Sequence, residues 1–282
     1  MVARSAAVAG HARLRYTISM AAFGVDVARQ EDGVAWLVLR NPERLNAVRL
    51  EMWQAIPPLV ADLAADRRVR VVVMRGDGTE AFASGADISE FSTHRKDAAS
   101  AAAYERTTAE AFEALTGFPK PLVAMIHGIC IGGGLALAAS ADLRVAADDA
   151  RLALPAARLG LGYHIKGVER LVRLLGPSAA SELFFTARRY DATEALRIGL
   201  VNQVVVKAEL ETFTARYAAD IAANAPLTLR AAKRAIAEVQ RDSASRDVEE
   251  VRALIAACFE SADYAEGVRA FLEKRPPKFR GE

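Results

Sequence analysis

Apolar segments with strand patterns alternate with helical segments over the first 206 residues, and only helical patterns follow. Val34–Arg40 and Pro121–Ile126 are apolar and rich in strand-forming residues. Val69–Met74 has the pattern of a strand that is buried on both faces. Between these strands, apolar residues recur at helical spacing over Ala47–Ala65 and Ala98–Leu115. This order predicts an α/β fold with a helical C-terminal part.

The remaining elements follow from the same patterns. Short strands are expected at Leu143–Ala146 and Val201–Val206, and Pro57-Pro58 is expected to kink the first helix. Further helices are predicted at Leu135–Ala141, Gly167–Leu175, Ser178–Phe185, Thr193–Leu196, Glu209–Asn224, Pro226–Gln240, Asp247–Ser261 and Asp263–Lys274. We therefore divide the chain into a core at residues 21–206 and a helical part at 207–282.

The composition excludes several classes of protein. The chain has 37 Lys and Arg against 35 Asp and Glu and carries no basic stripe, which argues against nucleic acid as the main partner. No apolar run approaches the ~20 residues that a membrane span requires. The two cysteines, Cys130 and Cys258, lack the spacing of metal ligands. We expect no metal site, reduced thiols and a cytoplasmic location.

The first 20 residues form a separate segment. They contain Arg4, Arg13 and Arg15, and no acidic residue occurs before Asp26. An organelle transit peptide is one interpretation of such a segment. We favour an extension that precedes a start at Met20 and is poorly ordered.

Two glycine-containing turns each join an apparent strand to a helix. They are residues 81–88 (AFASGADI) and 127–134 (HGICIGGG). Glycine lets backbone approach a ligand closely, and a helix N-terminus adds unpaired N–H groups. Two such turns that face one point would form a cradle for a developing oxyanion. A packing role is the alternative, whereas the glycine patterns of phosphate and dinucleotide sites are absent.

Five stretches together carry a specific set of motifs: NPERLNAV (41–48), AFASGADI (81–88), KPLVAMIHGICIGGGLALAASADLRVAADDARLALPAARLGL (120–161), GLVNQVV (199–205) and EGVRAFLEKRPPKF (266–279). In these stretches the chain resembles the crotonase (enoyl-CoA hydratase/isomerase) superfamily over nearly its whole length. The resemblance implies a spiral of ββα units and a C-terminal helical part that assembles a homotrimer or a hexamer.

The same resemblance implies an acyl-CoA substrate, with coenzyme A as part of that substrate and no separate cofactor. The thioester oxygen would lie between the backbone N–H groups of Ala86 and Gly133. The positions that match the family's coenzyme A contacts are Arg44, Leu45, Ala47, Ala83 and Ala86, together with Phe271 and Lys274 from a neighbouring subunit. A surface charge at Arg44 and a core position for Phe271 are the alternatives.

Two residues depart from the family pattern. Hydratases of the family place one glutamate two residues after the triple glycine and another after the proline of an LPE stretch, and the two exchange protons with water and substrate. Ala136 and Ala156 occupy these positions here. No Asp or Glu occurs at residues 132–141 or 150–168. The single glutamate of the family's simple isomerases is absent too.

A functional loop could replace these groups. Tyr163, His164 and Lys166 lie where relatives have a segment similar to GLIPGAGG. His164 falls where dienoyl-CoA isomerase-like members carry a catalytic Asp. Because histidine titrates near pH ~6.5, His164 is a candidate acid or base, with Tyr163 as a hydrogen-bond donor. A surface or packing role for the loop is the alternative.

Three other polar residues near the turns have structural interpretations. We expect Asp87 to fix the first turn by accepting backbone N–H groups. His127 matches a histidine of many relatives and is expected to be structural. Cys130 has no basic neighbour in the sequence, so a nucleophilic role is unsupported.

Two functional hypotheses follow. The first is an enzyme that acts on an acyl-CoA thioester through a backbone oxyanion hole, with a reaction other than efficient hydration. The second is a non-catalytic protein that binds acyl-CoA. We prefer the enzyme because the functional side chains of Tyr163, His164 and Lys166 could replace the missing glutamates in the chemistry.

Overall fold

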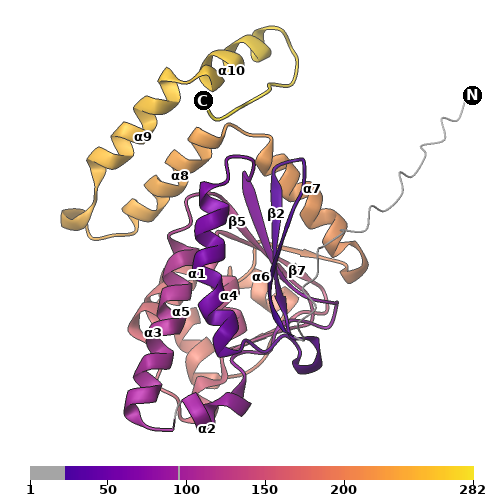
Figure 1. The fold of residues 1–282 in the computed structure, drawn as a ribbon, viewed down its shortest axis with the longest axis vertical. Coiled ribbons are helices and arrows are strands. Elements are labelled where there is room, and N and C mark those ends of the chain that lie inside the picture. The colour runs from indigo at the N-terminus through magenta and orange to yellow at the C-terminus, as the bar shows by residue number, and fades with distance from the viewer. Residues whose placement is uncertain (1–22, 95) are drawn as a thin grey trace, which may run out of the picture.

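A computed structural model describes residues 23–94 and 96–282. The extension predicted for residues 1–20 lies outside the described residues. A six-stranded sheet forms the centre of the molecule, with α1 and α3 on one side and α7 on the other (Figure 1). The helices α9 and α10 lie at the opposite end of the molecule from α2 and α3 (Figure 1).

The strands divide between two sheets. The larger sheet has the order β1-β2-β3-β5-β7-β10, and the smaller has the order β4-β6-β8-β9. Their bounds are β1 Gly24–Arg29, β2 Val34–Arg40, β3 Val71–Gly76, β4 Ala81–Ala83, β5 Leu122–Ile126, β6 Ile129–Ile131, β7 Leu143–Ala147, β8 Arg151–Ala153, β9 Tyr190–Asp191 and β10 Gln203–Val205.

The helices follow the order that the sequence predicts, with helices alone after β10. Their bounds are α1 Leu50–Ala65, α2 Phe91–His94, α3 Ala98–Thr116, α4 Gly133–Ser140, α5 Ile165–Thr186, α6 Ala192–Arg197, α7 Leu210–Ala222, α8 Pro226–Val239, α9 Val248–Glu260 and α10 Ala262–Leu272. No helix in the described part of the chain is both long and apolar enough to cross a membrane.

The larger sheet is buried on both faces. From β2 to β10 its strands are parallel, and only β1 pairs in the antiparallel sense. Because successive side chains point to opposite faces, Trp36 packs in the α7 layer while Leu37 packs in the α1 layer. This two-sided burial explains why β5 is apolar throughout and why β3 is apolar from Val71 to Met74.

The smaller sheet was not evident from the sequence, because its strands have only two or three residues each. Its β4 and β6 pair in parallel, and each lies within one of the two glycine-containing segments, before its glycines at 85 and at 132–134. The carboxyl ends of parallel neighbours lie at the same edge. The pairing of β4 with β6 therefore brings the two turns side by side.

Several predicted bounds differ from the structure. The first helix begins at Leu50 rather than Ala47, because Val48 pairs with Ala86 as an isolated bridge and holds this segment extended. The helix then includes both Pro57 and Pro58. In contrast, the break predicted between Leu175 and Ser178 is confirmed, because the non-helical Gly176 (φ +78°) kinks α5 and divides it into two helical parts.

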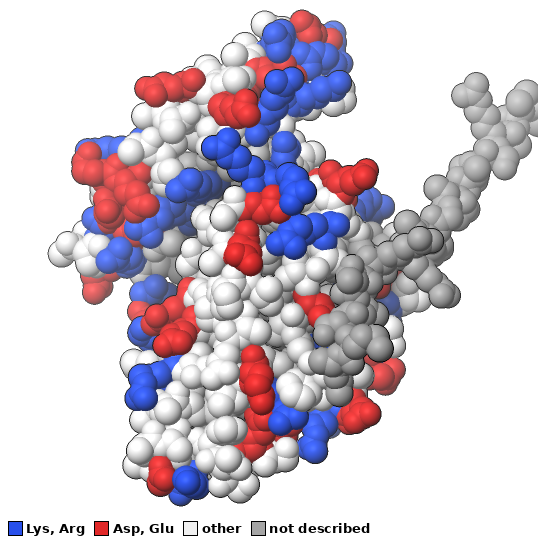
Figure 2. Space-filling model, in the orientation of Figure 1, with Lys and Arg blue, Asp and Glu red and all other residues white. Residues whose placement is uncertain are grey.

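The C-terminal helices expose large apolar side chains. On α9 and α10 these include Phe259, Val268, Phe271 and Leu272, and Phe271 is 83% exposed. Lys, Arg, Asp and Glu intermingle over the upper part of the face that Figure 2 shows, without a single-sign stripe. This end of the molecule thus combines mixed charge with unpaired apolar surface.

One buried histidine lies at the end of β5. His127 is 2% exposed, and its Nε2 has no hydrogen-bond partner among the described residues. Burial lowers the pKa of His127 to about 4, and the nearby positive charge of Arg75 adds to the effect. The imidazole is therefore neutral in the folded protein near pH 7.

Replacement of Gly134 should test the contact between α4 and β4. A Cβ at Gly134 would lie 2.3 Å from the carbonyl oxygen of Ala83, so the two elements would have to separate. We expect Gly134→Ala to lower the free energy of unfolding by about 2 kcal/mol, which lowers the thermal midpoint by roughly 4–8 °C. Gly162→Ala is the control, because no atom lies within 4 Å of its Cβ position. Equal midpoints for the two variants would contradict this packing.

The buried His127 should make stability depend on pH. The pKa of His127 is about 4 in the folded protein and 6.5 in the unfolded chain. The unfolded chain therefore binds more protons below pH 6.5, and the free energy of unfolding falls as the pH is lowered from 6.5 toward 4. We expect a loss of about 2 kcal/mol by pH 5 and about 3 kcal/mol by pH 4. Urea unfolding of wild type and of His127→Gln between pH 7.5 and 4 measures this loss of the free energy of unfolding. Parallel pH curves for the two proteins would show that His127 is not the cause.

Candidate active site

A large cavity opens between the core and the helices that surround it. Its volume is about 1440 Å³. The two glycine turns, one face of α3, the loop before α5 and parts of α4 and α8 form its wall. Ala86, Gly133, Tyr163 and His164 all line this cavity, so the structure brings the four predicted catalytic residues into one space.

Hydrogen bonds from neighbouring segments hold the first turn. The Val48 N–H donates to the Gly85 carbonyl, and the Val48 carbonyl accepts from the Asp87 N–H. The Asp87 carboxylate accepts from the Ser89 backbone N–H at 3.1 Å, as predicted. The buried Asn46 amide, which the sequence analysis did not identify, donates to the carbonyls of Asp77 and Ala81.

The second turn leads from β6 directly into α4. Gly132 has φ +57°, a backbone conformation that favours glycine, and its N–H donates to the Ala153 carbonyl. Gly133 is the first residue of α4. Its N–H therefore belongs to the first helical turn, where no intrahelical acceptor exists.

The two turns touch each other. A Cβ at Gly133 would lie 3.4 Å from the Ala86 nitrogen and 3.3 Å from the Trp53 ring. Within residues 23–94 and 96–282, neither the Ala86 nor the Gly133 N–H donates a hydrogen bond to the protein. Two backbone donors without a protein acceptor thus lie close together at the cavity wall, where they are available to a ligand oxygen.

No carboxylate stands beside these donors at the two positions noted in the sequence. Ala136, in the first turns of α4, and Ala156 both line the cavity and present only methyl groups. The cavity wall does contain five carboxylate residues from elsewhere in the chain: Glu105, Glu113, Asp142, Glu169 and Glu238. Glu105 and Glu113 were missed by the sequence analysis because they belong to α3, which carries no recognisable motif.

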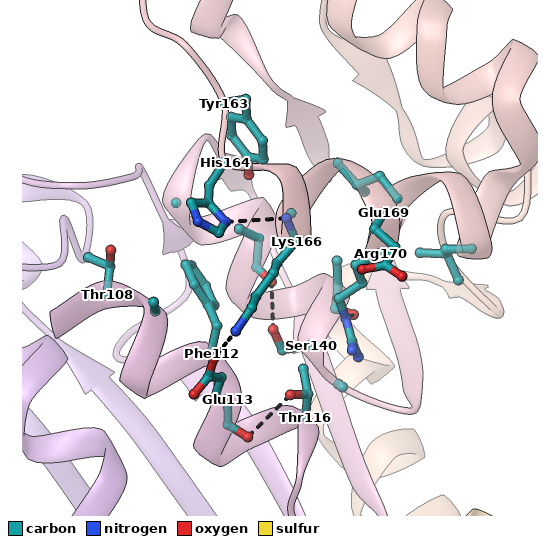
Figure 3. A pocket seen from close by; sticks show the side chains of 18 of the residues that line it. Thr108, Phe112, Glu113, Thr116, Ser140, Tyr163, His164, Lys166, Glu169 and Arg170 are labelled. Atoms are coloured by element: carbon teal, nitrogen blue, oxygen red, sulfur yellow. Dashed lines mark hydrogen bonds and ion pairs between the residues drawn. The ribbon is translucent and has the colours of Figure 1, made fainter. Parts of the chain in front are cut away.

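The loop before α5 contacts α3 across the cavity. The Nδ1 of His164 accepts the Lys166 backbone N–H at 3.2 Å and thereby caps α5. Its Nε2 lies 3.9 Å from an oxygen of Glu105. Figure 3 shows the Lys166 side chain extending to Glu113, with which it forms an ion pair. The N-cap His164 and the first turn of α5 therefore both lie against glutamates of α3.

Tyr163 has a more buried position than His164. Its ring packs edge-on against Phe184, with centroids 5.1 Å apart, and Gly167 leaves room for it. Burial raises the pKa of Tyr163 to about 12. The phenol is therefore protonated at neutral pH, which permits hydrogen-bond donation and excludes a role as a base.

Of the coenzyme A residues predicted near the N-terminus, Ala86 lines the cavity, whereas Arg44, Leu45, Ala47 and Ala83 lie in or beside the first turn without lining it. Ser84 donates its N–H to the Leu45 carbonyl and its hydroxyl to the Arg44 carbonyl. The side chains of Arg44 and Leu45 are exposed, whereas Ala47 and Ala83 are buried. Arg44 and Leu45 are thus the members of this set that face solvent.

Phe271 and Lys274 lie away from the cavity. Both are exposed and belong to the end of the chain around α10, at the far end of the molecule from α3 (Figure 1). Neither lines the cavity of its own chain. A contact with coenzyme A at this cavity would therefore have to come from another copy of the chain, as the sequence analysis expects.

Cys130 lies in β6, close to the second turn, and is fully buried. Burial raises the pKa of its thiol far above the ordinary value, so the reactive thiolate does not form near neutral pH. In the described ranges, no group of three His, Cys, Asp or Glu residues could hold a metal ion.

Comparisons with known proteins identify the family of this chain. The family model for enoyl-CoA hydratase/isomerase matches residues 29–282. The chain is 32% identical to a short-chain-enoyl-CoA hydratase of Clostridium acetobutylicum, over 88% of this chain and 95% of that protein. It is also 32% identical to a methylmalonyl-CoA decarboxylase of Escherichia coli, over 88% and 95% of the two chains.

The fold of this chain also matches solved structures of other proteins. An enoyl-CoA hydratase/carnithine racemase from Magnetospirillum magneticum superposes with a TM-score of 0.87 at 36% identity, covering 94% of this chain and 97% of that one. The predicted crotonase-type α/β fold is thereby confirmed. The chain belongs to the enoyl-CoA hydratase/isomerase family.

Proposed function

We propose that this protein is an enzyme that binds an acyl-CoA and polarises its thioester carbonyl with the N–H groups of Ala86 and Gly133. The observation that carries the proposal is the contact between the two turns, which leaves both donors unpaired at the wall of the cavity. Backbone donors fixed in this way stabilise the negative charge that develops on a thioester oxygen. Family membership supports the acyl-CoA substrate.

We further propose that the reaction is not efficient hydration of an enoyl-CoA. The positions that match the hydratase glutamates hold Ala136 and Ala156, which cannot transfer protons. A general acid or base contributes ~10²–10⁴-fold to a rate, so the loss of two is severe. His164, with Tyr163 as a hydrogen-bond donor, takes part in the proton transfer that remains. The relatives include both hydratases and a decarboxylase.

The assembly and the coenzyme A path complete the proposal. Arg44 and Leu45 contact coenzyme A beside the first turn, and Phe271 and Lys274 of a neighbouring subunit contact its phosphates. Lys274 is suited to this role because its ammonium is a compact positive charge. The exposed apolar surface of α9 and α10 supports a homotrimer or a hexamer. A cytoplasmic location stays a prediction.

Mass spectrometry of the purified protein with crotonyl-CoA and a panel of other acyl-CoAs tests the function. A new CoA product that depends on His164 would support the enzyme. A gain of one water would show that hydration persists, and free CoA would indicate thioester hydrolysis. Retention of ligand without any product would favour the non-catalytic binder, for which the alanines at 136 and 156 are the specific observation.

Gly133→Pro should remove one oxyanion donor, because proline has no N–H. Proline is well tolerated at the first position of a helix, where Gly133 lies. We expect turnover to fall by about 10²–10³-fold. Gly133→Ala is the matched control, since it adds a carbon at the same place and keeps the N–H. A folded proline variant with the turnover of the alanine variant would contradict the role of this donor.

Ala136→Glu combined with Ala156→Glu should raise hydration of crotonyl-CoA. Both positions line the cavity that contains the two donors, so carboxylates there would face a bound thioester. We expect a gain of about tenfold or more, measured by the loss of absorbance of the conjugated thioester. The single variants are the controls, since two groups are required. No gain in a folded double variant would mean that the cavity is shaped for another reaction.

A further inference from the structure

Glu105 is the cavity carboxylate that is least committed to a partner. Asp142 binds Lys233, Glu169 binds Arg173, Glu238 binds Arg234 and Arg241, and Glu113 binds Lys166. The Glu105 carboxylate, in contrast, accepts no hydrogen bond from the residues that the structure describes, and its side chain is 58% exposed. The side chain nearest to it among those residues that could pair with a carboxylate is His164, whose Nε2 lies 3.9 Å from a Glu105 oxygen.

The hydrogen bond at the other ring nitrogen orients His164. Because Nδ1 accepts the Lys166 N–H, Nδ1 carries no proton, and the proton of the neutral ring is on Nε2. Nε2 is the atom that faces Glu105. The neutral imidazole therefore presents a donor to a carboxylate. Catalytic hydrogen bonds are often long before substrate binds and shorten afterwards, which is consistent with the 3.9 Å separation.

Helical spacing directs Glu105 into the cavity. Thr108 and Phe112 follow it on the same face of α3, at intervals of three and four residues, and all three line the cavity. Phe112 packs edge-on against Trp53, with centroids 5.3 Å apart, and the Trp53 ring lies beside Gly133. These side chains form one continuous part of the cavity wall, which leads from Glu105 to the two backbone donors.

We propose that Glu105 is the base that removes a proton from the carbon next to the thioester, and that His164 is its positioning residue. This inference rests on the function proposed above and specifies its chemistry. The C–H bond breaks and the proton moves to the Glu105 carboxylate. The C–H electron pair forms a double bond to the carbonyl carbon, and the carbonyl π pair moves to the thioester oxygen between Ala86 and Gly133. Return of a proton from Glu105 to the same carbon, or to another carbon of an unsaturated chain, restores a neutral thioester. No further reactant is consumed.

Deuterium exchange detects this step without any other turnover. Butyryl-CoA and other short saturated acyl-CoAs are incubated with the full-length protein in D2O, and the mass of the acyl group is followed. Because Glu105 is exposed to solvent, its proton exchanges, and each cycle can replace one hydrogen by deuterium. We expect wild type to incorporate deuterium next to the thioester and Glu105→Gln to do so about 10²-fold or more slowly. Glu110→Gln is the matched control, because Glu110 is an exposed glutamate of α3 that does not line the cavity.

His164 is tested through its coupling to Glu105. If it acts through that carboxylate, His164→Ala slows exchange, and the variant that carries both changes is no slower than Glu105→Gln alone. A role limited to capping α5 would lower the unfolding midpoint and leave the effects of the two substitutions additive.

The outcomes separate this inference from the proposed function. Ligand binding is measured in parallel by calorimetry. Binding without exchange in wild type, or wild-type exchange in Glu105→Gln, overturns the assignment of Glu105 and leaves the acyl-CoA function in place. No binding of any acyl-CoA overturns both. Because substitution of an exposed side chain changes stability by less than about 0.5 kcal/mol, the Glu105 variant should fold.

Discussion

The close contact between the start of α4 and β4 is the constraint on which the candidate site depends. The Gly134 Cα lies so near the Ala83 carbonyl that a side chain would collide with it at 2.3 Å. This approach, together with the parallel pairing of β4 with β6, places Gly133 against Ala86, so that a Cβ at Gly133 would lie 3.4 Å from the Ala86 nitrogen. The donors are fixed by backbone packing before any ligand binds, so little reorganisation is required when charge develops.

The charged groups of the cavity come from elements other than those that supply the donors. Near the donors the wall has the small side chains of Ala136 and Ala156 and the aromatic rings of Trp53 and Phe112. Two of the glutamates, Glu105 and Glu113, belong to α3, and their partners His164 and Lys166 lie at the start of α5. Under the proposed function, this separation lets the backbone donors stay constant while the proton-transfer groups vary among family members, whose names include hydratases and a decarboxylase.

The helical end of the chain contributes to the site only if another copy is present. Phe271 is 83% exposed, and neither it nor Lys274 lines the cavity of its own chain. Large apolar side chains of this kind, gathered on α9 and α10, are costly to leave in water. A homo-oligomer would cover them and could bring the phosphate contacts to a neighbouring cavity.

The sequence by itself determined the fold class, the family and the two glycine turns. An apolar run such as Val69–Met74 predicts a strand that is buried on both faces, and glycines before a helix predict close backbone contact. Both features can be recognised within a short segment of the sequence. Only the tertiary structure decided that Val48 is extended by pairing with Ala86, and that Glu105 of α3 faces His164 of the loop before α5. Those contacts join residues that are distant in the chain, and no local pattern records which distant segments will meet.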